Sequence, residues 1–303
     1  MAERMVKANG VELCTEPFGD AADPPVLLVM GTGASMLWWE DGFCRMLADG
    51  GRFVIRYDLR DTGRSVTYEP GHPGYTGGDL VADAAGVFDA YQIPAAHVVG
   101  VSVGGAFAQL LALDFPDRVL SLVLISTSPA LPGDRRLPAP TEEFGRLVST
   151  AQVGWSDTDS VIDYLVDYSR VLAGGRRRFD EGAVRDLVRR DVERARDFAA
   201  VQNHDSIPDD DRPHRPLSSI AVPAPRSSTP PPTPCSQSPM ARHWPRRSPG
   251  RRCCRWKEQV TASIGTTGRP SSARSSNTRA QSRDMPPRQS IGRRSTHLPC
   301  TPA

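Results

Sequence analysis

Residues 97–109 have the sequence HVVGVSVGGAFAQ, and this stretch decides the predicted fold. Its apolar start predicts a buried strand and residues 106–114 predict a helix, so the motif G-x-S-x-G forms the turn between the two. In so tight a turn the central residue takes a strained backbone conformation, and only small residues avoid a clash at Gly100 and Gly104. The turn lifts Ser102 above the sheet at a helix N-terminus, where free N–H groups favour negative charge. Ser102 is therefore the candidate nucleophile.

The chain before and after this turn alternates strands with helices. Short apolar runs bounded by Gly, Asp or Pro predict strands at 11–15, 26–30, 54–58 and 119–125. Apolar residues at helical spacing predict helices at 37–47 and 80–91. Because strands that alternate with helices form parallel sheets covered on both faces, residues 1–127 are predicted to be an α/β core with a mostly parallel sheet.

Residues 128–215 have helical spacing without strand-like runs, which predicts helices at 141–150, 160–173 and 180–204. Such an insertion would cover the sheet as a cap or lid. Within it, Trp155, Tyr164 and Tyr168 would line an apolar acyl or polyketide pocket or would pack a core, and both interpretations stay open. Residues 216–223 then resemble the start of a further core strand.

The last quarter of the chain, residues 224–303, differs sharply in composition from the rest. It holds 14 Arg and one Lys against Glu258 and Asp284, a net charge of +13, whereas the preceding residues carry −11. Six residues of this tail are Val, Ile, Leu, Met or Phe, while Ser, Pro, Arg and Thr dominate. So few apolar groups cannot offset a chain entropy of about 1–2 kcal/mol per residue, so we expect the tail to be disordered.

Other features restrict the cofactors and partners. No stretch approaches the roughly 18 apolar residues that cross a membrane, and the first residues lack a signal-peptide pattern, so we expect a cytoplasmic protein with no membrane partner. The cysteines show no ligand or redox spacing, so we expect no metal and no cofactor. An alternative function is a non-catalytic protein whose basic tail binds nucleic acid or an acidic partner. A single Lys and the lack of interleaved aromatic residues argue against nucleic acid.

A serine nucleophile needs backbone donors for the oxyanion that forms when it attacks a carbonyl carbon. The first expected donor is the N–H of Val103, directly after Ser102. The second is expected from the loop after the strand at 26–30, where the N–H of Gly31 or of Thr32 would face the substrate. We favour Thr32 of these two.

The chain up to residue 223 resembles the α/β-hydrolase family, and within it the serine esterases that act as anthracycline methylesterases. The resemblance rests on FGD at 18–20, LLVMG at 27–31, RYDLRDTGRS at 56–65 and HVVGVS at 97–102. It implies hydrolysis of a small-molecule carboxylic ester through an acyl-enzyme, with the Asp and Arg of the third motif in structural roles. Lactonase, thioesterase or C–C hydrolase chemistry stays open. Epoxide hydrolases and dehalogenases have Asp in place of Ser102.

The resemblance further implies a catalytic Asp after a seventh strand and a His after an eighth, both beyond residue 223. In the tail, Asp284, His243 and His297 follow no strand. The earlier His72, His97, His204 and His214 fit surface or packing positions. As written, the chain therefore lacks the base and the acid that activate the nucleophile.

A shift of reading frame near residue 224 explains this loss. Back-translated with each codon begun one base earlier, the tail permits VVHATADPVF, a strand followed by Asp-Pro, and LEGAGHG before an amphipathic helix. The Asp codon spans Pro232 and Thr233, and the His codon spans Val260 and Thr261. We therefore predict that the tail is out of frame and that this chain is an inactive or impaired serine hydrolase.

Overall fold

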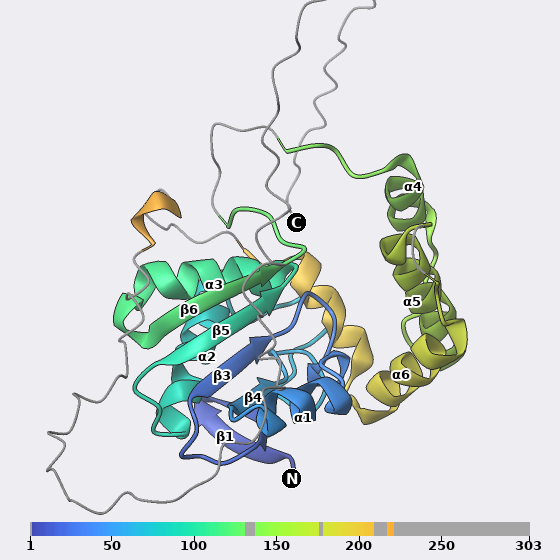
Figure 1. The fold of residues 1–303 in the computed structure, drawn as a ribbon. Coiled ribbons are helices and arrows are strands. Elements are labelled where there is room, and N and C mark those ends of the chain that lie inside the picture. Colours follow the sequence, from blue (N-terminus) through green and yellow to red (C-terminus); the bar gives the residue numbers. More distant parts are fainter. Residues whose placement is uncertain (1, 131–136, 176–177, 209–216, 221–303) are drawn as a thin grey trace, which may run out of the picture. The chain divides into compact units, whose positions relative to one another are not determined.

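The computed structural model describes residues 2–130, 137–175, 178–208 and 217–220. Within these residues, six strands form one sheet in the order β1-β2-β4-β3-β5-β6 (Figure 1). The strands are β1 (Arg4–Ala8), β2 (Val11–Phe18), β3 (Pro25–Val29), β4 (Phe53–Tyr57), β5 (Ala96–Val101) and β6 (Val119–Ile125). β1 and β2 pair antiparallel, as do β2 and β4, and the other neighbours pair parallel. The predicted mostly parallel sheet is confirmed, with β1 as a strand that was not predicted.

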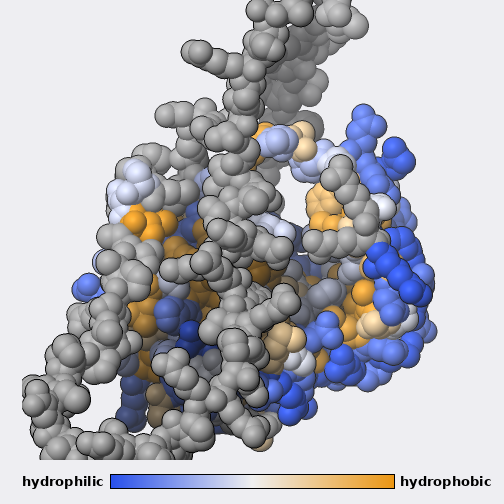
Figure 2. All heavy atoms as spheres, in the orientation of Figure 1, coloured by the Kyte–Doolittle hydropathy of each residue, from blue (hydrophilic) through white to orange (hydrophobic). Residues whose placement is uncertain are grey.

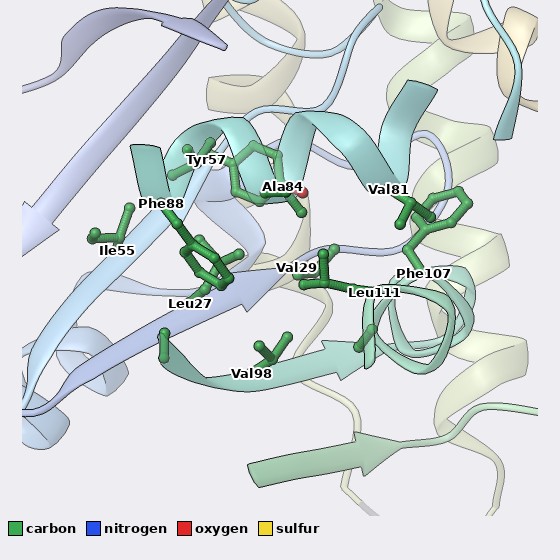
Figure 3. Packing of buried hydrophobic residues seen from close by; sticks show 14 of the residues in the cluster. Leu27, Val29, Ile55, Tyr57, Val81, Ala84, Phe88, Val98, Phe107 and Leu111 are labelled. Carbon is green, nitrogen blue, oxygen red and sulfur yellow. The ribbon is translucent and has the colours of Figure 1, made fainter. Parts of the chain in front are cut away.

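Helices cover both faces of this sheet, because successive strand residues point to opposite sides. Leu27 and Val29 of β3 pack with residues of α2 (Gly77–Ala90) and α3 (Val103–Asp114), as Figure 3 shows. The alternate residues Val26 and Leu28 belong to a second cluster that includes Cys44 of α1 (Asp41–Asp49). This alternation confirms the predicted α/β core with helices on both faces.

Two predicted helices differ from the observed ones in their bounds. The helix expected at 37–47 is divided into a 3-10 turn, Met36–Trp38, and α1, because the hydroxyl of Ser35 accepts the Leu37 N–H and closes a separate turn. The helix expected at 180–204 ends early. α6 (Glu181–Arg194) stops where the Arg196 N–H donates to the Gly63 carbonyl oxygen at 2.8 Å.

A 3-10 segment, Phe198–Asp205, follows α6 instead of the predicted continuous helix. The Asp197 carboxylate accepts the Ala199 N–H at 3.0 Å, and such local side-chain bonds compete with helix continuation. We call α4 (Glu142–Thr150), α5 (Thr158–Ala173), α6 and this 3-10 segment the cap. Figure 2 shows mainly hydrophilic side chains on the outer side of the cap helices.

The strand expected at 216–223 is wrong where the structure describes it. Leu217–Ser219 form a short 3-10 turn. Two consecutive serines favour local turn bonds over an extended strand, and strand propensity in so short a segment is weak. The remaining residues of that segment, and the tail at 224–303 with its expected disorder, lie outside the described residues.

The strand order places a crevice at one edge of the sheet. β3 has β4 on one side and β5 on the other, so the connections after β3 and after β5 diverge at the carboxyl ends of these strands. Open α/β sheets bind ligands in such a crevice. The loop after β3 and the turn after β5, which holds Ser102, therefore meet where a ligand is expected. No helix in the described part of the chain is long and apolar enough to cross a membrane.

Candidate functional site

Ser102 has the strained backbone that its turn predicts. Its φ of +53° and ψ of −126° lie in a region that side-chain-bearing residues rarely adopt. The residue is exposed, caps the N-terminus of α3, and donates its backbone N–H to the Ile125 carbonyl oxygen of β6 at 3.0 Å. The turn therefore presents the hydroxyl of Ser102 above the carboxyl ends of β5 and β6.

The two glycines of the motif are required by close backbone approaches. A methyl group at Gly100 would overlap the Gly104 carbonyl oxygen and would lie 2.6 Å from the Cα of Gly105. A methyl group at Gly104 would overlap the Met30 carbonyl oxygen. Because the start of α3 lies directly against the end of β3, any side chain at Gly104 would separate the serine turn from the loop after β3.

The loop after β3 contacts the serine itself. A methyl group at Gly31 would lie 3.2 Å from the Cβ and 3.7 Å from the Oγ of Ser102. The next residue, Thr32, lines a cavity, and the Gly33 N–H is already donated to His204 Nδ1 at 2.9 Å. Of the predicted donors, Gly31 thus lies next to the serine and Thr32 follows it at the wall of a cavity. Val103 provides the first N–H of α3, which has no partner within a helix.

His204 fixes this loop from the cap. Its Nε2 faces the Arg60 carbonyl oxygen at 2.8 Å, so this nitrogen carries the proton and Nδ1 accepts from Gly33. Burial lowers the pKa of His204, which keeps the ring neutral and able to accept. Sequence reasoning assigned His204 to a surface or packing role. The structure shows a buried ring that positions the loop beside Ser102.

No described histidine or carboxylate forms a hydrogen bond with the Oγ of Ser102. His97 instead lies at the start of β5, at the far end of the strand, where its Nδ1 contacts the Ser121 hydroxyl at 2.6 Å. His72 is exposed in a loop. His214 and the histidines of the tail lie outside the described residues. The same holds for the positions of the Asp and His that the shifted frame would encode. The lack of a catalytic base stays a prediction, because the segments expected to carry the acid and the base lie outside the described residues.

The loop after β4 carries structural charges, as the resemblance implied. Asp58 accepts the backbone N–H groups of Met36 and Arg64, both at 2.9 Å. Arg60 forms a two-pronged ion pair with Asp83 of α2 at 2.7 and 2.8 Å. These contacts fix the loop between the sheet and the cap.

The cap is anchored to the core by two buried charges of α6 that sequence reasoning missed. Arg194 pairs with Asp58 at 2.8 Å and with Glu3 at 2.7 Å. Asp191 accepts the indole N–H of Trp38 at 2.7 Å, and burial raises the pKa of its carboxyl to about 6. No sequence signal distinguishes these two residues from the other charges of α6, because their partners come from distant segments.

One cavity lies at the serine turn and another at the loop after β3. One, of about 190 Å³, includes Ser102, Val103 and residues 126–130 after β6. The other, of about 250 Å³, lies between Thr32, Gly33 and the cap, and its wall includes the three aromatic residues singled out in the sequence. Those residues therefore line a cavity. Among the described residues, no cluster of His, Cys, Asp or Glu side chains is suited to hold a metal ion.

Comparison with known proteins agrees with this geometry. Residues 24–156 match the family described as alpha/beta hydrolase fold. The rhodomycin D methylesterase DauP of Streptomyces sp. (strain C5) is 38% identical over 61% of this chain and 67% of its own length. The rhodomycin D methylesterase DnrP of Streptomyces peucetius is 37% identical over 59% of this chain and 65% of its own length. This chain thus spans about two thirds of these curated relatives.

A solved structure shows the same fold. A crystal structure from work on carboxylesterases of the thaumarchaeon Nitrososphaera gargenis superposes with a TM-score of 0.51 at 22% identity, over 69% of this chain and 73% of that one. At this identity the likeness concerns the fold alone. Taken with the matched sequence region and the methylesterase relatives, it shows that this chain belongs to the α/β hydrolase fold family.

Proposed function

We propose that this chain is the larger part of an ester hydrolase in which Ser102 forms an acyl-enzyme. The observation that carries the proposal is the backbone of Ser102, a strained and exposed serine at the N-terminus of α3 and next to Gly31. Strain of about 1–3 kcal/mol persists only where the surrounding fold holds it, and such residues cluster at functional sites. Two relatives are rhodomycin D methylesterases, so a methyl ester is the first substrate class to test.

The proposed reaction follows from the groups around the serine. The Oγ of Ser102 bonds to the ester carbonyl carbon, its proton passes to a base, and the carbonyl oxygen becomes an oxyanion. The N–H groups of Val103 and of Gly31 or Thr32 stabilise this charge in our proposal, because both segments adjoin the serine. Collapse of the intermediate expels the alcohol, and water then hydrolyses the acyl-enzyme.

The base is the part that this chain lacks in our proposal. A serine hydroxyl is a weak nucleophile without a histidine to take its proton. We propose that a shift of frame near residue 224 removed the acid, encoded across Pro232 and Thr233, and the base, encoded across Val260 and Thr261. Loss of both lowers kcat by about 10⁴- to 10⁶-fold in enzymes of this type. The chain as written is therefore expected to turn over esters at a very low rate.

The test compares four proteins on p-nitrophenyl acetate and on an aromatic methyl ester. They are the present chain, a chain in which one base is inserted near codon 224 to restore the other frame, and each of these two chains with Ser102→Ala. We expect turnover at an ordinary enzyme rate from the restored chain alone. Ordinary turnover by the present chain that Ser102→Ala abolishes would refute the missing base, and an inactive restored chain would refute the proposed frame.

A further inference from the structure

The cavity between the cap and the loop after β3 has a wall of four aromatic rings. They form a row in which the centroids of Trp155 and Tyr164 lie 6.1 Å apart, those of Tyr164 and Tyr168 6.0 Å, and those of Tyr168 and Phe144 5.5 Å. The planes are tilted by 48° to 74°, so the ring faces are turned in several directions. All four residues line the same cavity as Thr32 and Gly33.

These rings are not fully used in packing. Each of the four is only half-buried, whereas the cap residues that form its core, such as Val161, Ile162 and Val166, are 1% exposed. A row that served only to pack the cap would be buried in the same way. The half-exposed ring faces are therefore available to a ligand in the cavity.

A carboxylate completes the wall without a partner of its own. Asp205 lines the cavity from the end of the 3-10 segment, and its side chain has no hydrogen bond or ion pair with any described residue. Burial raises the pKa of Tyr164 and that of Tyr168, and the negative charge of Asp205 adds to both rises. Among the described residues that line the cavity there is no Lys, Arg or His. The described part of the cavity wall thus combines aromatic rings with one exposed carboxylate.

We propose that this cavity binds an organic cation, a protonated or quaternary amine carried by the substrate, against the faces of Trp155, Tyr164 and Tyr168 and beside Asp205. Ring faces attract cations through their quadrupole, and a carboxylate at the rim adds a charge of the right sign. The inference rests on the proposed function in one respect only, namely that the ester of the same molecule lies at Ser102. Thr32, which lines this cavity, follows Gly31, where an added methyl group would lie 3.2 Å from the Cβ of Ser102.

Binding can be tested on the full chain without any turnover. The probes are phenyltrimethylammonium and its neutral isostere tert-butylbenzene, titrated at equal low salt by isothermal calorimetry below the solubility limit of the isostere. A cation over the face of one ring gains roughly 2- to 30-fold in affinity, so we expect the ammonium probe to bind at least about tenfold more tightly. Equal affinity of the two probes would show an apolar pocket for neutral groups and would overturn the proposal.

Four variants locate the site. Asp205→Asn should weaken the ammonium probe by about twofold to fivefold, as a partly exposed charge would, and should leave the isostere unchanged. Tyr164→Leu should weaken it further, with Tyr164→Phe as the ring-preserving variant that retains affinity if the leucine variant fails to fold. Asp186→Asn, at an exposed acid on α6, is the matched control and should have no effect. If neither Asp205→Asn nor Tyr164→Leu weakened the binding of the ammonium probe, the probe would bind elsewhere and the proposal would be overturned.

The two proposals fail separately. A frame-restored chain that hydrolyses esters but shows no preference for the ammonium probe would refute the cation site alone. A chain that prefers the ammonium probe but stays inactive in both frames would refute the proposed hydrolysis alone.

Discussion

Replacement of Arg194 by methionine tests how the cap is held. Methionine keeps the stem that packs on the core and removes the guanidinium that pairs with Asp58 and Glu3. The side chain of Asp58 is 0% exposed and that of Arg194 8%, so the substitution leaves a buried carboxylate without its countercharge. Removal of one partner of a buried pair costs about 3–5 kcal/mol, and the more exposed Glu3 adds at most about 1 kcal/mol. We expect a loss of about 3–5 kcal/mol in the free energy of unfolding.

The assay is equilibrium unfolding in urea, followed by circular dichroism, in a double-mutant cycle with Asp58→Asn. Because Asn carries no charge, the double variant should be about 1–3 kcal/mol more stable than the sum of the single effects predicts. Arg185→Met is the matched control, since Arg185 pairs with Asp163 and Glu181 at the surface and its loss should leave the free energy of unfolding nearly unchanged.

The pH dependence gives a second measurement of the same pair. Burial raises the pKa of Asp58, and the guanidinium of Arg194 opposes this rise. Without Arg194 the folded-state pKa rises further above the unfolded value. Such a carboxyl contributes stability that is present at low pH and is lost as pH rises through the folded pKa. The loss in free energy of unfolding caused by Arg194→Met should therefore become smaller as the pH is lowered. Two results would refute a stabilising ion pair between Arg194 and Asp58. One is additive changes in the free energy of unfolding in the cycle, and the other is a small loss for Arg194→Met that does not depend on pH.

Further predictions concern three other positions. The pKa of Asp191, raised from 3.8 to about 6, makes its stabilising contribution fully present only below about pH 3.8 and lost as pH rises through 6, at a cost of about 3 kcal/mol above pH 7. Asp191→Asn should therefore raise the melting temperature much more at pH 8 than at pH 4.5, and a gain of equal size at both would contradict this. Leu124→Lys, on the exposed face of β6, should reduce aggregation measured by light scattering, whereas Leu172→Lys on the cap should not. Gly104→Ala should prevent cooperative thermal unfolding, because its methyl group overlaps the backbone of β3, and a wild-type melting curve would contradict this.

The turn at Ser102 is predictable from sequence because its determinants are adjacent along the chain. An apolar strand, two small residues and a helix that follows at once leave few other conformations, and the observed φ of +53° is the strained state that this pattern implies. The loop after β3 is predictable for the same reason, since its glycines come directly after a strand. The local sequence pattern is thus enough to predict the nucleophile and the loop beside it.

Features that depend on distant partners escape such prediction. β1 has the mixed sequence RMVKA and becomes a strand because Met5 pairs with Cys14 and Val6 with Leu13 of β2. Arg194 and Asp191 belong to a helix whose charges all look alike in sequence, and only the approach of Asp58 and Trp38 decides which are buried. His204 is a similar case, because its two partners lie 171 and 144 residues away.

The left-handed backbone of Ser102 also has a thermodynamic consequence. Only glycine adopts such a conformation freely, so Ser102→Gly should be more stable than the natural chain by up to about 1–3 kcal/mol. This strain is a sizeable part of a total free energy of unfolding of about 5–15 kcal/mol. Exposure of the apolar side chains of Val123, Leu124 and Ile125 of β6 lowers that free energy as well. Substitutions that destabilise the sheet should therefore release the strained backbone of Ser102 before the secondary structure around it changes.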